Sequence, residues 1–372
     1  MKITVPHLGN VYIAVEALLN EMGHELVLPP QSSRRTLTLG TKYSPETVCL
    51  PLKLGVGNIL EGIELGADTV LMVGGRGPCR LGYYAALEEE ILFDLGKKVE
   101  FIVLDHPKED FRRLRSQLLP LIRKKGWRAL IRGLVLAWEK LMAVEKLERT
   151  SHYVRPRESE YRITSQLLAE ALQRLRSAAT VAEIRSVCRQ GCEAMLAEAV
   201  RVDYQPLRIG IVGEIYTILD SFSNLDLEER LGHLGAEVYR TVSLVEWLKD
   251  HVIRSSLGLY SNKHLIDKAQ GYLHASVGGH GLESVARTVI LAEEQYDGII
   301  HILPFTCMPE IVAQCILPNV SLDYQIPVLS LVVDEHTGEA GFQTRLEAFV
   351  DLLARRSEGE WAYGTPISLS RS

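Results

Sequence analysis

The sequence lacks the features that mark membrane and secreted proteins. Its 372 residues contain no run of about 18 apolar residues, the length that a membrane-spanning helix needs. The N-terminal string MKITVPHLGN enters a strand-like segment without the charged region and long apolar stretch of a secretory signal. We therefore expect a soluble, cytoplasmic protein with no membrane partner.

The sequence also lacks the usual marks of nucleotide or nucleic-acid binding. The net charge is −6 with both signs interspersed, which gives no basic footprint for nucleic acid. The glycine-rich strings GVGNILEG and GGRGPCRLG break the G-x-G-x-x-G register, and GGHGLES has Ser284 at its third glycine position. No string matches G-x-x-x-x-G-K-[ST]. We expect the chain itself to bind no nucleotide.

No C-x-x-C pair occurs among the six cysteines, which excludes ferredoxin-type and zinc-ribbon motifs. In a reducing cytosol, six cysteines are not expected to form structural disulfides. The absence of both patterns leaves free thiols, or thiolates that bind a metal or a cluster through residues far apart in the sequence.

What is present is an alternation of short apolar runs and helical segments in two separate parts of the chain. Residues 1–106 and 207–356 alternate in this way, which is typical of βαβ units and a parallel sheet. Residues 107–206 show apolar residues three to four apart with no strand candidate, and 357–372 form a polar tail. The predicted fold is α/β, with two Rossmann-like parallel-sheet domains and a helical middle domain.

Three cysteines stand out because each lies close to a proline at the start of a predicted helix: Cys49, Cys79 and Cys307. A thiol at a helix N-terminus meets the positive end of the helix dipole, which favours the thiolate and an anionic cluster. Cys79 and Cys307 also each follow a predicted strand, at the edge of a sheet where ligands bind. Soft sulfur ligands suit an iron–sulfur cluster, zinc or copper(I), although spacing alone also fits buried structural cysteines.

The other three cysteines lie inside predicted helices. Cys188 and Cys192 are four residues apart on one helix face, where packing is the favoured interpretation and metal binding the alternative. Cys315 is interpreted as a core residue of an apolar helix. A larger cluster that uses all six thiols is a further alternative.

Several polar residues are expected near strand ends, where they could serve as acid–base groups or ligands. Arg76 and Arg80 flank Cys79 and could complement the charge of a cluster or a substrate, with ion pairs or surface positions as the alternative. The remaining candidates are His7, Asn10, Glu214, Tyr216, His280, Glu335, His336 and Glu339. For the last three, a solvated loop is the competing interpretation.

Four strings taken together resemble a known superfamily: SPETVCLPLKLGVGNILEGIELGAD, GPCRLGYY, PFTCMPEIVAQ and DEHTGEAGFQTRLEAFVDLL. They are similar to the 2-hydroxyacyl-CoA dehydratase superfamily, in its branch of acyl-CoA dehydratase activase-related proteins, which are like the D component of 2-hydroxyglutaryl-CoA dehydratase. The resemblance covers both α/β parts and is weakest in the helical middle.

The resemblance implies that Cys49, Cys79 and Cys307 ligate a [4Fe-4S] cluster between the two α/β domains, with a double cubane as the variant seen in one branch. It also implies that a dimeric ATPase of the actin/Hsp70/sugar-kinase fold delivers low-potential electrons. Dehydratase relatives use these electrons to eliminate water from a 2-hydroxyacyl-CoA through a ketyl radical, and the double-cubane branch reduces small molecules.

The chain departs from the well-understood dehydratases in two ways. It is one polypeptide where those enzymes have two unlike subunits, and no CoA-binding signature can be assigned in it. The expected function is therefore a cluster-containing dehydratase or reductase component that acts on an acyl-CoA or another small molecule. The alternatives are a noncatalytic electron carrier for an ATPase and a metal-free small-molecule-binding protein. A homodimer is also considered.

Overall fold

Two four-stranded sheets, with every strand parallel to its neighbours, organise the protein. The computed structural model describes residues 1–74, 79–104, 111–201, 203–249 and 263–358. The first sheet has the order β2–β1–β3–β4 and consists of β1 (Lys2–Thr4), β2 (Glu25–Leu26), β3 (Thr69–Val73) and β4 (Glu100–Leu104). The predicted α/β class with two Rossmann-like parallel sheets is confirmed.

The second sheet repeats the strand order of the first. It runs β6–β5–β7–β8 and consists of β5 (Leu207–Gly213), β6 (Ala236–Arg240), β7 (Gly298–Pro304) and β8 (Val328–Val333). Every residue of β7 is buried, which agrees with its nearly continuous apolar sequence GIIHILP and its central place in a covered parallel sheet. Strands β1 to β4 thus correspond one by one to β5 to β8.

The helices of the first part cover its sheet and include one that the sequence analysis did not predict. They are α1 (Tyr12–Met22), α2 (Arg34–Tyr43), α3 (Leu50–Glu64), the 3₁₀ helix η1 (Arg80–Tyr83), α4 (Tyr84–Asp94) and α5 (Phe111–Ile122). The unpredicted helix, α2, begins with a capping box between Ser33 and Thr36. It packs so closely on α3 that a Cβ on Gly57 would lie 2.1 Å from the carbonyl oxygen of Thr36.

The second part follows the same plan. Its helices are α9 (Ile215–Leu219), α10 (Leu227–His233), α11 (Leu244–Leu248), α12 (Lys263–Ala269), α13 (Gly281–Glu293), α14 (Met308–Tyr324) and α15 (Glu339–Ser357). In chain order, helix α13 directly precedes the central strand β7 as α3 directly precedes β3. Helix α14 then follows β7 as α4 follows β3. The two halves therefore have equivalent helices at equivalent ends of their sheets.

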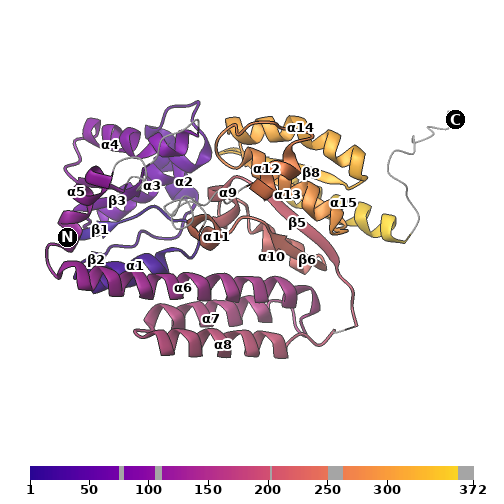
Figure 1. Ribbon diagram of the computed structural model, residues 1–372, viewed down its shortest axis with the longest axis horizontal. Coiled ribbons are helices and arrows are strands. Elements are labelled where there is room, and N and C mark those ends of the chain that lie inside the picture. The colour runs from indigo at the N-terminus through magenta and orange to yellow at the C-terminus, as the bar shows by residue number, and fades with distance from the viewer. Residues whose placement is uncertain (75–78, 105–110, 202, 250–262, 359–372) are drawn as a thin grey trace.

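A layer of long helices lies along the lower side of both sheets in Figure 1. It consists of α6 (Gly126–Val154), the 3₁₀ helix η2 (Arg155–Arg157), α7 (Ile163–Ser177) and α8 (Val181–Ala197). Leu147, Leu175 and Ile184 are fully buried where these helices pack together. Helix α5, which also falls in the stretch 107–206, packs instead with the first sheet, through Leu121 and Ile122.

Helix α6 joins the two halves. With 29 residues it is about 44 Å long, enough to pass beneath both sheets. Its first half lies against α1, where a Cβ on Gly133 would be 3.0 Å from Leu18. Its second half meets the second sheet through the ion pair of Glu148 with Arg240 at 2.6 Å. The helical layer thus fixes both halves to one rigid element.

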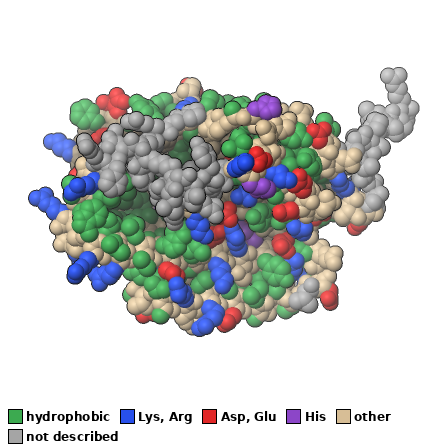
Figure 2. Space-filling model, in the orientation of Figure 1, with side chains coloured by type: hydrophobic (Ala, Val, Ile, Leu, Met, Phe, Trp, Pro, Cys, Tyr) green, Lys and Arg blue, Asp and Glu red, His purple; other side chains and the backbone are tan. Residues whose placement is uncertain are grey.

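The surface agrees with the charge pattern of the sequence. On the face shown in Figure 2, Lys and Arg side chains alternate with Asp and Glu, with apolar side chains between them. Within the described ranges, no helix has the length and apolar character that crossing a membrane requires.

Candidate functional site

Each of the three predicted cysteines is the N-cap residue of a helix. Cys49 precedes α3, Cys79 precedes η1 and Cys307 precedes α14. Pro51 and Pro309 occupy the second position of their helices, where a missing N–H breaks no helical hydrogen bond. Local sequence therefore places all three sulfur atoms at helix N-termini, as predicted.

The structure brings the three cysteines to one cavity. Cys49, Cys79 and Cys307 line it together with Pro51, Arg80, Leu81, Tyr84, Glu214, Met308 and Pro309. The cavity encloses about 340 Å³ of space, counted with the solvent at its mouth. Residues from both halves of the chain form its wall, so the site exists only when the two halves are together.

Chain topology explains this location. In the second sheet the chain goes from β5 to β6 and then crosses to β7 on the other side of β5, so the ends of β5 and β7 border a topological switch point. Glu214 follows β5, and Cys307 follows β7. Cys79 follows β3, which is the corresponding strand of the first sheet. The cavity thus lies where α/β sheets bind ligands, for both sheets at once.

Arg80 links the three cysteine segments. Its guanidinium donates hydrogen bonds to the carbonyl oxygen of Thr47 at 3.2 Å and to that of Thr306 at 2.6 Å. It also lies 3.1 Å from the hydroxyl oxygen of Thr306. Thr47 precedes Cys49 by two residues and Thr306 directly precedes Cys307, so one side chain next to Cys79 ties all three segments together.

Burial controls the protonation of the three thiols. Desolvation raises the pKa of Cys49 to about 11, although a hydrogen bond with the Tyr84 hydroxyl opposes the shift. Desolvation likewise raises the pKa of Cys79 and of Cys307. The expectation that helix N-termini would favour thiolates is thus outweighed in the protein without bound metal. Cationic iron would reverse this, since a thiol that binds a metal is deprotonated.

Backbone groups near two of the sulfur atoms favour the thiolate. The N–H of Leu81 lowers the pKa of the Cys79 thiol and the N–H of Glu310 lowers that of the Cys307 thiol, although neither sulfur accepts a capping hydrogen bond. Such donors stabilise negative charge on sulfur once a metal is bound. They are the structural consequence of the N-cap positions.

Glu214 adds a carboxylate to the cavity wall. It is 8% exposed and caps α9, accepting hydrogen bonds from the N–H groups of Tyr216 at 2.9 Å and Thr217 at 2.8 Å. Burial raises its pKa, which the charge of His280 opposes. It lines the cavity with the three cysteines, and its negative charge raises the pKa of each of them.

The donor set fits a cluster better than a single metal ion. Among the described residues, no three or more His, Cys, Asp or Glu side chains are close enough together to hold one ion. In a cubane, each thiolate binds a different iron, so the sulfur atoms need not approach as closely as the ligands of one ion. Gly279 lies at the wall, where a Cβ would be in van der Waals contact with the sulfur of Cys79 at 3.7 Å and would crowd Pro309 at 3.0 Å. Three thiols at one cavity are the donor set that a cubane with one non-cysteine iron would use.

Two interactions beside the site were missed from the sequence. The Tyr84 hydroxyl contacts the sulfur of Cys49. Behind Cys307, the carboxylate of Glu310 accepts a hydrogen bond from Ser284 at 2.9 Å and lies 2.9 Å from Nε2 of His301. A histidine within the apolar strand HILP was the available signal, because a fully buried imidazole requires a polar partner.

The remaining cysteines lie outside the cavity. Cys188 and Cys192 are each 6% exposed and pack in the core of the helical layer, as predicted. The prediction of Cys315 as a core residue is wrong, because its side chain is exposed. The buried residues Ala313, Leu317 and Val320 define the inner face of α14, and position 315 falls on the opposite face.

The other polar candidates are not brought to the cavity. His7 bonds to the carbonyl oxygen of Pro29, and Asn10 bonds to Glu148. Glu335 forms an ion pair with the buried Lys53 of α3, which is a second link between the two halves. His336 and Glu339 are exposed, and Arg76 lies outside the described residues. Tyr216 contributes only its backbone N–H to the site, which donates a hydrogen bond to the carboxylate of Glu214.

Comparison with known proteins adds no relative: no family model matches the chain, and no curated protein matches it either. The nature of the site therefore rests on the cysteines, on their surroundings and on the resemblance of the four sequence strings.

Proposed function

We propose that the chain is an iron–sulfur protein of the 2-hydroxyacyl-CoA dehydratase type. In this proposal Cys49, Cys79 and Cys307 hold one [4Fe-4S] cluster. The observation that carries it is that three N-cap cysteines from both halves line one cavity at the switch points of both sheets. The other three cysteines lie elsewhere, which supports a single cubane rather than a double cubane within one chain.

Each surrounding residue then has a defined task. The N–H groups of Leu81 and Glu310 favour negative charge on the sulfur atoms of Cys79 and Cys307, and Arg80 holds the ligand segments together. When bound, the cluster supplies a low-potential centre for reductive or radical dehydration of a 2-hydroxyacyl-CoA or another small molecule. The carboxylate of Glu214 adds negative charge at the site, which favours a low reduction potential.

The electrons come from an ATP-hydrolysing activator of the actin/Hsp70/sugar-kinase fold. An exposed apolar rim at the cavity supports contact with a protein there: Leu81 is 37% and Met308 49% exposed, and both line the cavity. Phe305, two residues before Cys307, is 58% exposed. Exposed apolar side chains of this size are typical of a surface that binds another protein.

A second candidate is a noncatalytic electron carrier that receives electrons from the ATPase and passes them on. The composition of the cavity supports it, because Arg80 and Glu214 are the only charged side chains lining it in the described part of the chain. A carrier needs the cluster and the exposed rim, whereas an enzyme also needs groups that bind and orient a substrate.

Iron content after anaerobic reconstitution tests the cluster. We expect about four irons per chain and the broad visible absorption of an iron–sulfur centre. Cys49→Ala, Cys79→Ala and Cys307→Ala should each lose most of the iron. Cys315→Ala is the matched control, since it lies on the same helix as Cys307 but is exposed, and it should keep a full complement. Iron retained by Cys307→Ala, or absent from the wild type, would refute the assignment.

Turnover separates the two functions. The reconstituted protein is reduced with titanium(III) citrate and then mixed with 2-hydroxyacyl-CoA thioesters of different chain length. An enzyme releases water from one of them and forms the unsaturated thioester. A carrier is reduced by the titanium(III) citrate and leaves every thioester unchanged, and this result would favour the second candidate.

A further inference from the structure

We infer that the exposed face of α6 binds a second copy of the chain, so that the protein is a homodimer. The inference rests on a stripe of apolar side chains along this helix, which the proposed function does not use. The stripe is separate from the apolar rim of the cysteine cavity, whose residues belong to η1, to α14 and to the segment just before α14. The inference is therefore independent of the cluster.

The apolar stripe consists of five residues of α6: Trp127, Ile131, Val135, Trp138 and Met142. At about 100° per residue they fall within an arc of about 80°, and the stripe is about 22 Å long. Four of these side chains are between 40% and 60% exposed, Trp138 is half-buried, and Leu134 lies just outside the arc. Apolar side chains gather over the first half of α6 in Figure 2. Apolar residues at this spacing are typical of a helix that packs against another helix.

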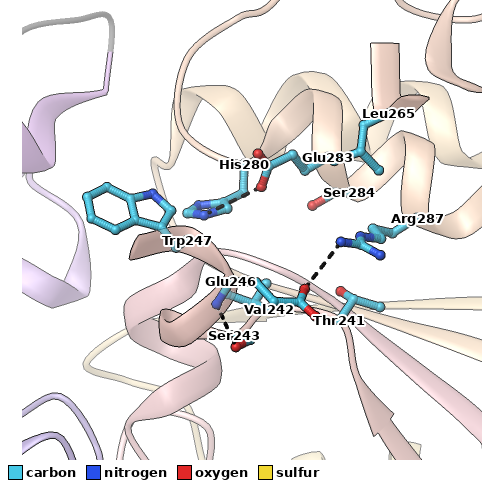
Figure 3. Close-up of a pocket in the computed structure, with 10 residues that line it drawn as sticks. All are labelled: Thr241, Val242, Ser243, Glu246, Trp247, Leu265, His280, Glu283, Ser284 and Arg287. Carbon is cyan, nitrogen blue, oxygen red and sulfur yellow. Dashed lines mark hydrogen bonds and ion pairs between the residues drawn. The ribbon is translucent and has the colours of Figure 1, made fainter. Parts of the chain in front are cut away.

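Charged side chains bound the stripe toward the end of the helix. Beyond the stripe, the same helix face carries Glu145 and Arg149, which pair at 2.6 Å. Arg149 also lies 3.6 Å from Glu246. Figure 3 shows Glu246 directed at Arg287, 3.5 Å away, in the wall of a cavity that His280 also lines. An apolar centre next to a polar rim is the usual composition of a protein interface.

The stripe is complementary to itself when two copies of α6 run antiparallel. A two-fold axis at the level of positions 134 and 135 places Trp127 opposite Met142 of the second copy. The same axis places Ile131 opposite Trp138 of the second copy, and Val135 meets its own counterpart. A two-fold interface requires this kind of self-complementarity, because both copies contribute the same surface. The stripe therefore fits a second copy along its whole length.

The charges beside the stripe also favour the antiparallel arrangement. Arg128, Arg132 and Glu139 all flank the stripe on one side, about 60–100° from its centre. In the antiparallel pair, Glu139 of one copy lies at the level of position 130 of the other, between Arg128 and Arg132. The Glu139 carboxylate already pairs with Arg185 at 2.6 Å, and its remaining lone pairs can accept from a second arginine. Opposite charges thus meet twice, once on each side of the two-fold axis.

The area of the stripe is sufficient for a dimer interface. Side chains of this size at about half exposure present on the order of 500 Å² of apolar surface, near the upper end of the largest patch on a typical monomer. Two copies would bury about 1,000 Å² through the stripe alone, which is the lower bound for a specific interface. The flanking charged side chains add to this area.

Sedimentation of the full chain at micromolar concentration tests the dimer. We expect a species of twice the chain mass of 41.6 kDa. Val135→Lys brings two ammonium groups together at the axis and should raise the dimer dissociation constant about 100-fold or more, since like charges in an interface cost several kcal/mol. Val200→Lys is the matched control, because Val200 is 58% exposed and lies outside the stripe, and it should stay dimeric.

A cross-link tests the arrangement even if Val135→Lys folds poorly. In Val135→Cys, copper phenanthroline should take two electrons from the two thiols at the axis, release two protons and leave one disulfide between the copies. A band of double mass on a non-reducing gel reports it. Wild type and Val200→Cys give the background of the native cysteines, among which Cys315 is exposed.

Three results would each overturn the inference. They are a monomeric wild type, a Val135→Lys variant with unchanged dimer affinity, and a Val135→Cys variant with no band above the background. A monomeric wild type would assign the stripe to a different protein. Iron uptake is measured in the same samples and should not differ between Val135→Lys and wild type, so failure of the dimer and failure of the proposed function are distinguishable.

Discussion

Among the places where the two halves of the protein meet, two differ clearly in their chemistry. Where α6 meets the second sheet, buried charges are paired: Arg240 lies 2.6 Å from Glu148 and 3.3 Å from Glu228, which is 3.1 Å from His152. At the cysteine cavity, the buried groups are thiols with raised pKa values and a carboxylate without a paired cation within the wall. The charges at α6 are thus paired within the protein, whereas the thiols and the carboxylate of the cavity are groups that a bound ligand could engage.

The largest expected effect follows from Leu147→Ala in α6. Leu147 is fully buried in the core of the helical layer, and its truncation should lower the free energy of unfolding by about 2–5 kcal/mol. Urea denaturation measures the loss, and iron content at low denaturant should stay normal. Leu134→Ala on the same helix, which is 51% exposed, should change stability by less than about 0.5 kcal/mol. If Leu147→Ala lost iron but kept its stability, the helical layer would serve the cysteine site and not the stability of the fold, which is the opposite of what we expect.

Acid should weaken the paired charges of the helical layer. Burial alone would raise the pKa of Glu228, but His152 and Arg240 lower it to about 2. In the unfolded chain this carboxyl titrates at about pH 4.3. The stabilisation that it gives the folded state is therefore present above that pH and is lost as the pH falls toward 2, by up to roughly 3 kcal/mol. The difference in unfolding free energy between wild type and Glu228→Gln should therefore shrink from pH 5 to pH 2. A difference independent of pH would show that the carboxylate is not stabilised by its neighbours.

Gly279→Ala should affect the cavity more than the fold. Gly279 has a φ of +49°, so a side chain costs about 1 kcal/mol, and its Cβ would also press on Pro309 at 3.0 Å. We expect less iron after reconstitution and a modest drop in stability. Gly271→Ala has open space around its Cβ and should retain full iron. Equal iron content in the two variants would contradict the proposed closeness of Gly279 to the cluster.

The smallest effect on stability is expected for Arg80→Met, because the side chain is exposed. Loss of its bonds to Thr47 and Thr306 should nevertheless free the ligand segments, so that a chelator removes iron several-fold faster. Arg80→Lys, which keeps the charge but not the two-sided geometry, should be intermediate. Arg174→Met in the helical layer is the control and should release iron at the wild-type rate. Unchanged release from Arg80→Met would show that the link has no role in holding the site.

The sequence contains enough information for the central strands and the positions of the cysteines. The strand Thr69–Val73 was predicted with its observed bounds, because a short apolar run between helices is unambiguous. The three N-cap cysteines were recognised because proline marks the first turn of two of their helices. Helix α2 escaped prediction, since its polar composition shows little of the apolar pattern on which the prediction relied.

The individual side-chain contacts between the halves could not be predicted from local sequence patterns. Arg80 and Thr306 are 226 residues apart, and no local pattern records that they meet. The direction of the thiol pKa shifts was also beyond the sequence, because the helix position is local but the degree of burial depends on both halves. Cys315 was misplaced because the apolar helix α14 has too few polar residues to reveal its outer face.

The long helix α6 has a mechanical consequence for the cysteine cavity. Its first half is packed on α1, and its second half is tied to the second sheet by Glu148 and Arg240. Because an α-helix hardly stretches, the two sheets cannot slide apart along this axis. A motion that slides the two sheets apart in this direction must bend α6 or break its contacts, so the helix limits how far the two sides of the site can separate along its axis.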